Sequence, residues 1–264
     1  MRRILKSDLD KFYTKVDLAK RLIEKVDIDK YDLVIDPCCG DGSFYNNILN
    51  NKIGIDISPD IDDVIKSDYL LWDYSKFLKN PFDLNVLVIS NPPFGKQGSL
   101  AMKFVKRSCE FANTVAFILP ISFSKPSIKN RIPKYFHLIY EEILPSNSFL
   151  LDSYDYDVKC VFQVWERRLY ERDYIDPIKA YGFSYTKNPT LSDMSVRRVG
   201  VYAGNAFLET NKSKQSHYFL IIDNKEMIND IFSTLNNTVW EDLTVGPRSI
   251  SKSELNLIIN SIIN

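Results

Sequence analysis

The run from Leu84 to Ser90 (LNVLVIS) constrains the fold more than any other segment, because it is almost entirely apolar and stops abruptly. Asn91-Pro92-Pro93-Phe94-Gly95 follows it directly, and two consecutive prolines cannot continue a strand. A short apolar run of this kind predicts a central strand that is buried on both faces. The run YDLVID (31–36), which ends in an acid before proline and glycines, predicts a second buried parallel strand.

Strand-like and helix-like segments alternate along roughly the first 165 residues. Helices are expected around Ser43 to Asn50 and from Ser99 to Ala112, where apolar residues recur at helical intervals. This alternation predicts an α/β fold with a doubly wound sheet. The other expected strands are KIGID (52–56), a short strand ending near Asp68, TVAFILP (114–120), HLIYEEIL (137–144) and VKCVFQVWE (158–166).

The pattern changes after Glu166, where turn residues become frequent and no clear alternation of strands and helices is visible. We therefore predict a main α/β domain over residues 1–169, followed by a small mixed appendage over residues 170–264 that serves substrate recognition or an accessory role. The length of 264 residues fits this division into a catalytic domain and a small addition.

Composition excludes several classes of protein. With 45% hydrophobic and 26% charged residues, the chain is neither disordered nor fibrous. No apolar run reaches the roughly 18 residues of a membrane span, and the start MRRILKSDLDKF lacks the apolar core of a signal peptide. The four cysteines form neither a disulfide framework nor a CxxC metal pair. We therefore expect a cytoplasmic protein with no membrane contact and no metal.

The segment from Asp36 to Phe44 (DPCCGDGSF) carries the first candidate site. A strand that ends in an acid and continues through two glycines is typical of a nucleotide cradle, because glycine lets a ligand approach the backbone. Asp56, at the end of the next expected strand, can accept both hydrogen bonds from a ribose diol. The third glycine of a dinucleotide fingerprint is replaced by Phe44, which argues against NAD. Taken alone, the two glycines are equally consistent with a tight structural turn.

The segment Asn91-Pro92-Pro93-Phe94 carries the second candidate site. It follows a central strand, at the edge where open α/β sheets bind ligands. The prolines hold the asparagine and its carbonyl rigidly outward. The Asn91 side-chain oxygen and the Pro92 carbonyl can each accept one hydrogen of an amino group, and Phe94 can stack on a planar ring. The alternative interpretation is that the motif only ends a strand. The presence of the first candidate site in the same chain makes a functional role the stronger interpretation.

Together the two segments resemble motifs of the class I S-adenosylmethionine-dependent methyltransferases of the N6-adenine type. DPCCGDGSF matches the glycine-rich motif of that family, NPPFG (91–95) its catalytic motif, and Phe12-Tyr13-Thr14 its N-terminal FYT element. The resemblance covers about residues 11–165, although Cys38, Cys39 and Asp41 are not the commonest residues of the loop. It implies a Rossmann-like sheet of seven strands with a reversed final hairpin, and S-adenosylmethionine as the cofactor.

The resemblance also implies a role for each matching residue. The catalytic residues would be Asn91, Pro92, Pro93 and Phe94. Phe12, Tyr13 and Thr14 would line the methionine end of the cofactor, Asp36 would meet its amino group, and Gly40 and Gly42 would contact it through the backbone. Asp56 would hold the ribose, and Asp68 would take the adenine amino group with Tyr69 nearby. The other expected cofactor-binding residues are Pro37, Phe44, Ile57 and Asn91.

The implied reaction is a direct displacement, in which the enzyme aligns a methyl donor that is already activated with an exocyclic amine. Hydrogen bonds from the amine to Asn91 and Pro92 would hold its lone pair toward the methyl carbon and stabilise the developing charge. The mechanism needs no general base, and His137 and His217 are interpreted as structural.

A local excess of positive charge indicates where a substrate would lie. The 34 basic and 34 acidic residues balance, which excludes a globally cationic nucleic-acid protein. Between Lys96 and Lys134, however, eight basic residues face one acid, Glu110. A basic strip beside a base pocket fits contact with phosphates, although part of it also fits a solvated helix face. The candidate substrate contacts are Lys96, Lys125, Lys129, Arg131, Arg197 and Arg198.

Two further segments are candidates for contact with the substrate. The stretch VGVYAGNAF, which follows Arg198, is either a target-recognition element or an ordinary capping hairpin. Residues 146–156 are expected to form a loop rich in aromatic side chains, which could wall in an extruded base.

Three functions are consistent with these motifs. The first is an adenine-N6 methyltransferase that acts on nucleic acid, with DNA ahead of RNA. The second is a protein-glutamine methyltransferase, because an amide NH2 presents similar geometry. The third is a catalytically silent subunit that binds nucleic acid, and against it stand the intact Asp36, Gly40, Asp56 and Asn91. A homo-oligomer or a partner subunit stays open.

Overall fold

The computed structural model describes residues 12–78, 83–244 and 246–263. The expectation about a leader at MRRILKSDLDKF therefore falls on residues that lie, except for Phe12, outside the described part. Two units follow one another along the chain, Met1–Tyr174 and Ile175–Asn264. No helix within the described residues is long and apolar enough to cross a membrane.

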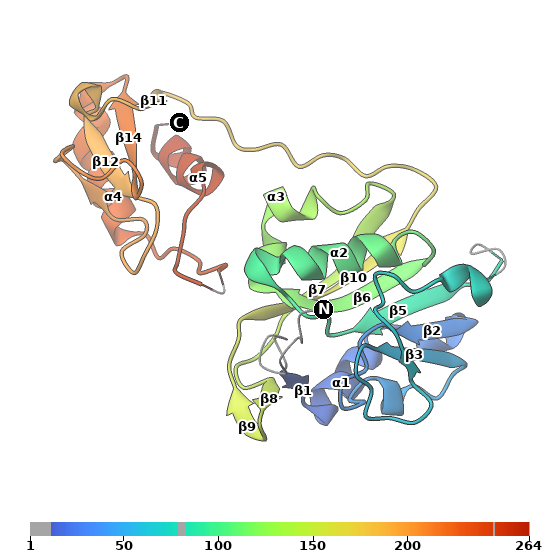
Figure 1. The fold of residues 1–264 in the computed structure, drawn as a ribbon. Coiled ribbons are helices and arrows are strands. Elements are labelled where there is room, and N and C mark those ends of the chain that lie inside the picture. Colours follow the sequence, from blue (N-terminus) through green and yellow to red (C-terminus); the bar gives the residue numbers. More distant parts are fainter. Residues whose placement is uncertain (1–11, 79–82, 245, 264) are drawn as a thin grey trace. The chain divides into compact units, whose positions relative to one another are not determined.

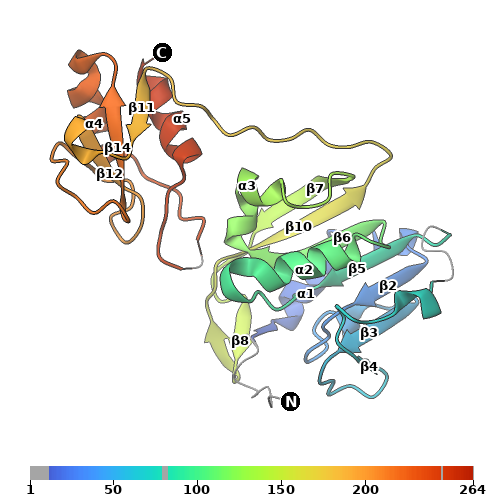
Figure 2. The same cartoon turned by 45° about the horizontal axis from the view of Figure 1, so that its top comes forward.

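The first unit is built on a sheet of seven strands in the order β4-β3-β2-β5-β6-β10-β7, which confirms the expected α/β fold (Figures 1 and 2). Strands β4, β3, β2, β5 and β6 run parallel to one another, and β10 runs antiparallel to both β6 and β7. The strands are β2 (Leu33–Asp36), β3 (Lys52–Asp56), β4 (Ile65–Lys66), β5 (Val86–Ser90), β6 (Thr114–Pro120), β7 (Phe136–Ile143) and β10 (Cys160–Arg167).

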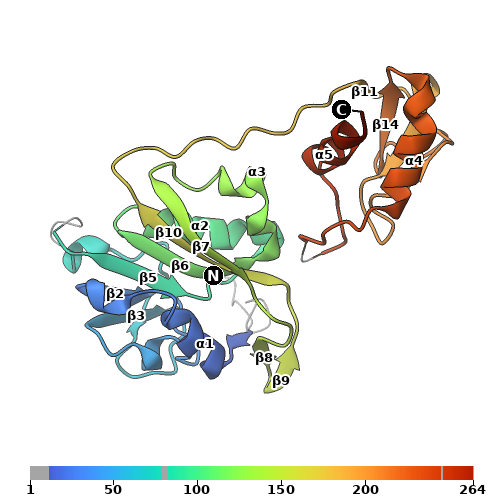
Figure 3. The ribbon, with the colours of Figure 1, turned by 180° about the vertical axis from the view of Figure 1, so that it is seen from behind.

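The central strands are apolar because both faces of the sheet are covered. Every residue of β2, β5 and β6 is buried. Helix α1 (Val16–Ile23) covers one face, and α2 (Ser99–Ser108) covers the other (Figures 1 and 3). Leu18 and Leu22 of α1, and Phe104 and Val105 of α2, point inward at helical spacing, which is why each helix is amphipathic.

The helix expected at residues 43–50 is wrong. The segment contains only the single 3₁₀ turn η3 (Tyr45–Asn47). The side-chain amide of Asn47 donates to the main-chain oxygen of Ser43, so a side chain takes an acceptor that a longer helix would use. Asparagine therefore ends the turn that the glycines begin.

The aromatic segment 146–156 is not an irregular loop, as expected, but a hairpin. Strands β8 (Phe149–Leu151) and β9 (Tyr154–Tyr156) pair antiparallel, and Asp152 and Ser153 at the turn both have positive φ. Strand β1 (Tyr13–Thr14) adds to β8 and completes a small three-stranded sheet. The pairing brings the N-terminal FYT element, for which no secondary structure was predicted, to the hairpin.

The second unit contains a four-stranded antiparallel sheet in the order β11-β14-β12-β13. Two helices pack on it, because Ile231 and Leu235 of α4 and Leu255 and Ile259 of α5 share a core with the sheet. His217 is the first residue of β14. The elements are β11 (Phe183–Thr186), β12 (Met194–Arg197), β13 (Ala206–Phe207), β14 (His217–Ile222), α4 (Ile228–Asn237) and α5 (Lys252–Ile263).

Short helices connect the larger elements of both units. They are η2 (Ile28–Lys30), η4 (Tyr74–Lys76), η5 (Lys96–Gly98), η6 (Ile121–Ser124), α3 (Pro126–Lys129), η7 (Pro189–Leu191) and η8 (Lys225–Met227).

Gly54 in β3 lies against a small cluster of buried side chains that supports the glycine-rich loop. A methyl group on its α carbon would lie 2.7 Å from a Tyr45 ring carbon and 2.8 Å from both Cys39 Sγ and Val64 Cγ2. We predict that Gly54→Ala lowers the free energy of unfolding of the first unit by about 1–3 kcal/mol through overpacking. Urea titration followed by tryptophan fluorescence, in a Trp240→Phe background that leaves tryptophans in the first unit only, measures this change.

The control is Gly246→Ala in the second unit, where nothing lies within 4 Å of the added methyl group apart from the chain neighbours. It is measured with Trp240 retained, so that its own unit carries a tryptophan. An unchanged urea midpoint for Gly54→Ala would show that the loop and its supporting cluster yield at no cost, and would contradict the prediction.

Candidate functional site

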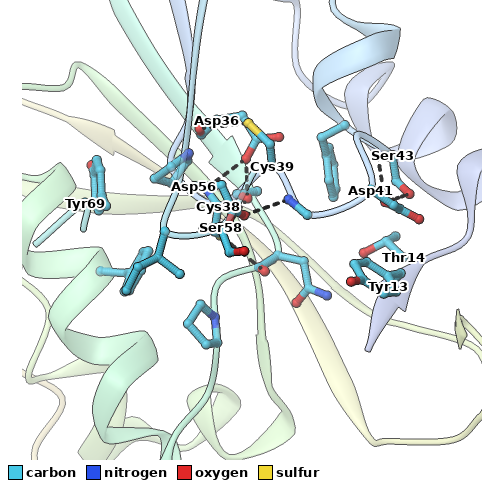
Figure 4. Close-up of a pocket in the computed structure, with 18 of the residues that line it drawn as sticks. Tyr13, Thr14, Asp36, Cys38, Cys39, Asp41, Ser43, Asp56, Ser58 and Tyr69 are labelled. Atoms are coloured by element: carbon cyan, nitrogen blue, oxygen red, sulfur yellow. Dashed lines mark hydrogen bonds between the residues drawn. The ribbon is translucent and has the colours of Figure 1, made fainter. Parts of the chain in front are cut away.

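A pocket opens where the parallel strands β2, β3 and β5 end (Figure 4). Each strand delivers a polar residue to it, because the carboxyl ends of parallel strands meet at one edge of the sheet. Asp36 ends β2, Asp56 ends β3 and Ser90 ends β5. The other lining residues are 37–41, 43 and 44 of the loop after β2, residues 57, 58, 60 and 67–70, the segment 12–14, Asn91 and Pro93, and Leu100 and Phe104 of α2.

The glycine-rich loop is fixed by hydrogen bonds to its own residues and to β3. The amide of Gly40, at φ +54°, donates to Asp56 Oδ2 at 2.9 Å. Gly42 has φ +88°, and a β carbon there would lie 2.3 Å from Asn46 Nδ2. Gly42 therefore makes the turn and, unlike Gly40, does not line the pocket. Its amide donates to the carbonyl of Cys39 at 2.8 Å.

Asp36 is an acid in an almost fully buried position, with 1% of its surface exposed. Its Oδ1 accepts hydrogen bonds from Ser90 Oγ at 2.6 Å and from the amide of Cys38 at 3.2 Å. Burial raises the pKa of Asp36 to about 7, against the opposing effect of these two bonds, and the nearby charge of Asp56 adds to the rise. A positive ligand beside Asp36 would lower the pKa again.

Three buried polar atoms around the pocket lack a hydrogen-bond partner among the described residues: Thr14 Oγ1, Asp36 Oδ2 and Asn91 Oδ1. All three residues line this pocket. An unpaired buried acceptor costs about 1–3 kcal/mol, so three of them in one pocket fit a ligand that brings hydrogen-bond donors. The amide oxygen of Asn91 can only accept a hydrogen bond, and so can the carboxylate of Asp36 when it is ionised.

The charge of the pocket points to a cationic ligand. Asp36, Asp41, Asp56, Asp60 and Asp68 line it, and its described lining contains no lysine, arginine or histidine. Asp56 is positioned by the amides of Gly40 and Ser58, and Asp68 Oδ1 accepts the amide of Leu70 at 2.9 Å. The residues present therefore fit a ligand with a positive centre and several donors.

An apolar slot adjoins the acids. The Tyr69 ring stacks on Phe104 with centroids 5.2 Å apart, and the Tyr69 hydroxyl bonds to Ser108 Oγ at 2.7 Å. Phe44 and Ile57 both line the pocket. Phe44 is buried, whereas 44% of the surface of Ile57 is exposed. A planar apolar group fits beside these rings.

The four residues of the NPPF segment do not all face the pocket. Asn91 and Pro93 line it, while Pro92 and Phe94 are buried and do not. Phe94 packs edge-on against Phe12 with centroids 5.2 Å apart, and Phe12 also contacts Phe149 at 4.9 Å. In this state Phe94 joins the NPPF segment to the FYT element, so its expected stacking on a substrate ring stays a prediction.

The expected substrate contacts have different environments. Lys96 and Arg131 are exposed, and Lys125 is half-buried. Lys129 is only 16% exposed at its side chain and forms an ion pair with Glu141 at 2.8 Å, and Glu141 also accepts from the buried Gln163. Lys129 therefore supports the fold beside β10.

Arg197 and Arg198 belong to the second unit. Arg197 Nε donates to the carbonyl of Val199 at 3.0 Å, and the Arg198 guanidinium lies 5.6 Å from the Tyr218 ring centre. Arg198 is exposed and Arg197 is half-buried.

Sequence reasoning overlooked several residues of the pocket. Ser90 directly precedes Asn91 and bonds to Asp36, and its position at the end of an otherwise apolar strand could have marked it. Cys38 was treated only as an unusual loop residue. The remaining overlooked lining residues are Cys39, Asp41, Ser43, Ser58, Asp60, Ser67, Leu70, Leu100 and Phe104.

Comparison with known proteins gives likenesses in structure only. No protein-family model and no curated protein sequence matches the chain. One similar solved structure is a Pyrococcus horikoshii protein provisionally described as an RNA methyltransferase, with 17% identity over 60% of this chain and 87% of that one, at a TM-score of 0.45.

Two others cover different shares of the chain. A Vibrio vulnificus YJ016 protein, provisionally described as the modification subunit of a type I restriction enzyme, is 14% identical over 92% of this chain and 56% of its own, at a TM-score of 0.46. The 23S rRNA methyltransferase ErmE is 12% identical over 61% of this chain and 71% of its own, at a TM-score of 0.45.

The raised pKa of Asp36 makes the stability of the ligand-free first unit depend on pH. The folded state binds the Asp36 proton more tightly than the unfolded state, so this group's stabilising contribution is complete below pH 4 and is lost as pH rises to about 7. We predict that Asp36→Asn, which keeps an acceptor for Ser90, changes the free energy of unfolding by about 3 kcal/mol more favourably at pH 8 than at pH 5, because about two pH units of the Asp36 titration lie between them. Urea unfolding at the two pH values measures this difference.

The control is Asp62→Asn, which changes an exposed carboxylate close to the pocket. An equal effect of Asp36→Asn at both pH values would show that Asp36 does not change its protonation between them.

Proposed function

We propose that the protein is an S-adenosylmethionine-dependent methyltransferase that transfers a methyl group to the exocyclic amine of adenine in nucleic acid, DNA ahead of RNA. The observation that supports this best is the side-chain oxygen of Asn91, a buried acceptor with no partner among the described residues, in the same pocket as Asp36 and Asp56. An amine held by this oxygen would lie next to a cation held by the acids.

The pocket offers complementary groups for each part of this cofactor. Asp36 Oδ2 would accept from the α-ammonium group, Asp56 from the ribose hydroxyls and Asp68 from the adenine amino group. Tyr69 and Phe104 would border the adenine ring. When bound, S-adenosylmethionine supplies a methyl group that its positive sulfur already activates.

The protein's own residues then have three tasks. Asn91 Oδ1 and the Pro92 carbonyl accept the two hydrogens of the amine and direct its lone pair into the pocket. The carboxylates stabilise the cation in a partly dehydrated site, where electrostatic effects are strong. Phe12, packed on Phe94, excludes water from the side of the NPPF segment.

Nucleic acid is favoured as the acceptor by the exposed basic residues that follow the NPPF segment. Lys96 is exposed directly after Gly95, and Arg131 is exposed beyond α3. Lys96 directly follows the parallel strand β5 at the edge that holds the pocket, whereas Arg131 lies between α3 and β7. Cations beside a base site bind the phosphates next to the reacting nucleotide.

Two substitutions separate methyl transfer from cofactor binding. We predict that Asn91→Ala lowers the rate of transfer by about 100-fold or more, because an acceptor for the amine is lost, while S-adenosylhomocysteine still binds. Asp56→Ala should instead weaken that binding. The assays are transfer of radiolabel from S-adenosylmethionine to duplex DNA, single-stranded DNA, structured RNA and protein, with mass spectrometry of the labelled product, and calorimetry for binding.

The matched control is Asn85→Ala, at the opposite end of β5, where the side chain donates to the carbonyl of Lys30 at 2.8 Å. Label in N6-methyladenine supports the proposal and identifies the polymer. Label only in protein glutamine would instead indicate a protein-glutamine methyltransferase. Binding of the cofactor without any transfer would indicate a catalytically silent subunit. Loss of binding in Asn91→Ala would mean that the site is misassigned.

The basic residues give a separate prediction. The double variant Lys96→Ala/Arg131→Ala should weaken nucleic-acid binding and reduce the slope of log K against log salt by about 2 for duplex DNA, one phosphate for each residue. Fluorescence anisotropy at several salt concentrations measures the slope. The control, Lys20→Ala/Lys66→Ala, removes two exposed lysines from α1 and β4. Equal slopes for the two double variants would place the nucleic acid elsewhere.

A further inference from the structure

A chain of polar side chains links the two strands that carry the site. Ser90 Oγ, at the end of β5, donates to Asp36 Oδ1 at 2.6 Å. The Cys38 sulfur lies 3.0 Å from the same Ser90 oxygen, and it lies 3.4 Å from the main-chain carbonyl oxygen of Asn91, to which it donates. Asp36, Cys38, Ser90 and Asn91 all line the pocket. Neither Cys38 nor Ser90 has a part in the proposed displacement.

The direction of these bonds follows from the number of hydrogens available. An ionised carboxylate can only accept, so the one hydrogen of Ser90 must point to Asp36. Ser90 Oγ then has only lone pairs to offer Cys38, and the thiol hydrogen is shared between Ser90 and the Asn91 carbonyl. If Asp36 carries a proton, Ser90 can donate to sulfur instead, and the thiol hydrogen goes to Asn91 alone.

The thiol is suited to this part because it stays protonated. Burial raises the pKa of the Cys38 thiol well above its ordinary value, and the charge of Asp36 acts in the same direction. Cys38 is therefore a hydrogen-bond donor and not a nucleophile. The backbone pairing of β2 with β5 ends at Ile35 and Val88, so the side chains of Cys38, Ser90 and Asp36 continue the link between the strands where the ladder stops.

We propose that Cys38 and Ser90 are positioning residues, which tie the main chain of Asn91 to the carboxylate of Asp36 and so hold the amine site in register with the cation site. The catalytic part of this inference rests on the proposed function, whereas the chain of bonds does not. The titratable groups that face Asp36 are Asp56 on β3, Cys38 and Cys39 on the loop, and Tyr45 on η3.

The bonds can be tested without cofactor or substrate. We expect the carbonyl carbon of Asn91, labelled with carbon-13, to titrate with the same midpoint as the carboxyl carbon of Asp36, because protonation of Asp36 redirects the thiol hydrogen. Cys38→Ala should remove the titration at Asn91 and leave that of Asp36. An Asn91 carbonyl that is insensitive to pH in the unmodified protein, or unaffected by Cys38→Ala, would overturn the inference.

Kinetics test the positioning role. Cys38→Ala and Ser90→Ala should each lower kcat about tenfold with little change in binding of S-adenosylhomocysteine, since small displacements of reacting groups are costly. Their effects should not add, because both act through one chain of bonds. Cys38→Ser keeps a donor and should retain most of kcat. The control is Cys160→Ala, a buried thiol in β10 that does not line the pocket.

The two assays fail in different ways. Coupled titration without methyl transfer to any acceptor would reject the proposed function and leave the chain of bonds standing. Methyl transfer in the unmodified protein with equal kcat losses for Cys38→Ala, Cys38→Ser and Cys160→Ala would reject the positioning role alone.

Discussion

The hydrogen bond from Ser90 to the buried carboxylate of Asp36 is the interaction on which the site depends. It joins β2 to β5 just beyond the last backbone pair, where both chains leave the sheet. The same carboxylate has a second oxygen without a partner among the described residues, so its burial is only partly compensated. A fold that keeps such a group gives up stability in return for a place where a cation is strongly preferred.

The small sheet of β1, β8 and β9 supplies what the main sheet cannot, a wall on the side of the NPPF segment. Two residues of β1 are too few to be stable alone, and they are held by pairing with β8 and by the contact of Phe12 with Phe94 and Phe149. Aromatic contacts thus connect an N-terminal segment to the residues that follow β5. The pocket is consequently lined by three parts of the sequence, within residues 12–14, 36–70 and 90–104.

Sequence patterns predicted the parallel core well because β2, β5 and β6 are buried on both faces, and burial leaves a continuous apolar run. They failed at residues 43–50, where side-chain amides compete with the helix, and at the hairpin 149–156, whose turn depends on two residues with positive φ that are not glycine. Most pocket residues that motifs could mark were predicted. The ion pair of Lys129 with Glu141 was not predicted, because the two residues are distant in sequence and no local pattern shows such a pairing. The expected contact of Lys129 with a substrate stays a prediction.

The pairing of β1 with β8 has a consequence for the synthesis of the chain. Tyr13 leaves the ribosome early, but its partner Leu150 is added only after β7 has been made. The wall that carries Phe12, Tyr13 and Thr14 therefore cannot close while the growing chain is shorter than that. The pairing therefore places the completion of this pocket late in the folding of the first unit.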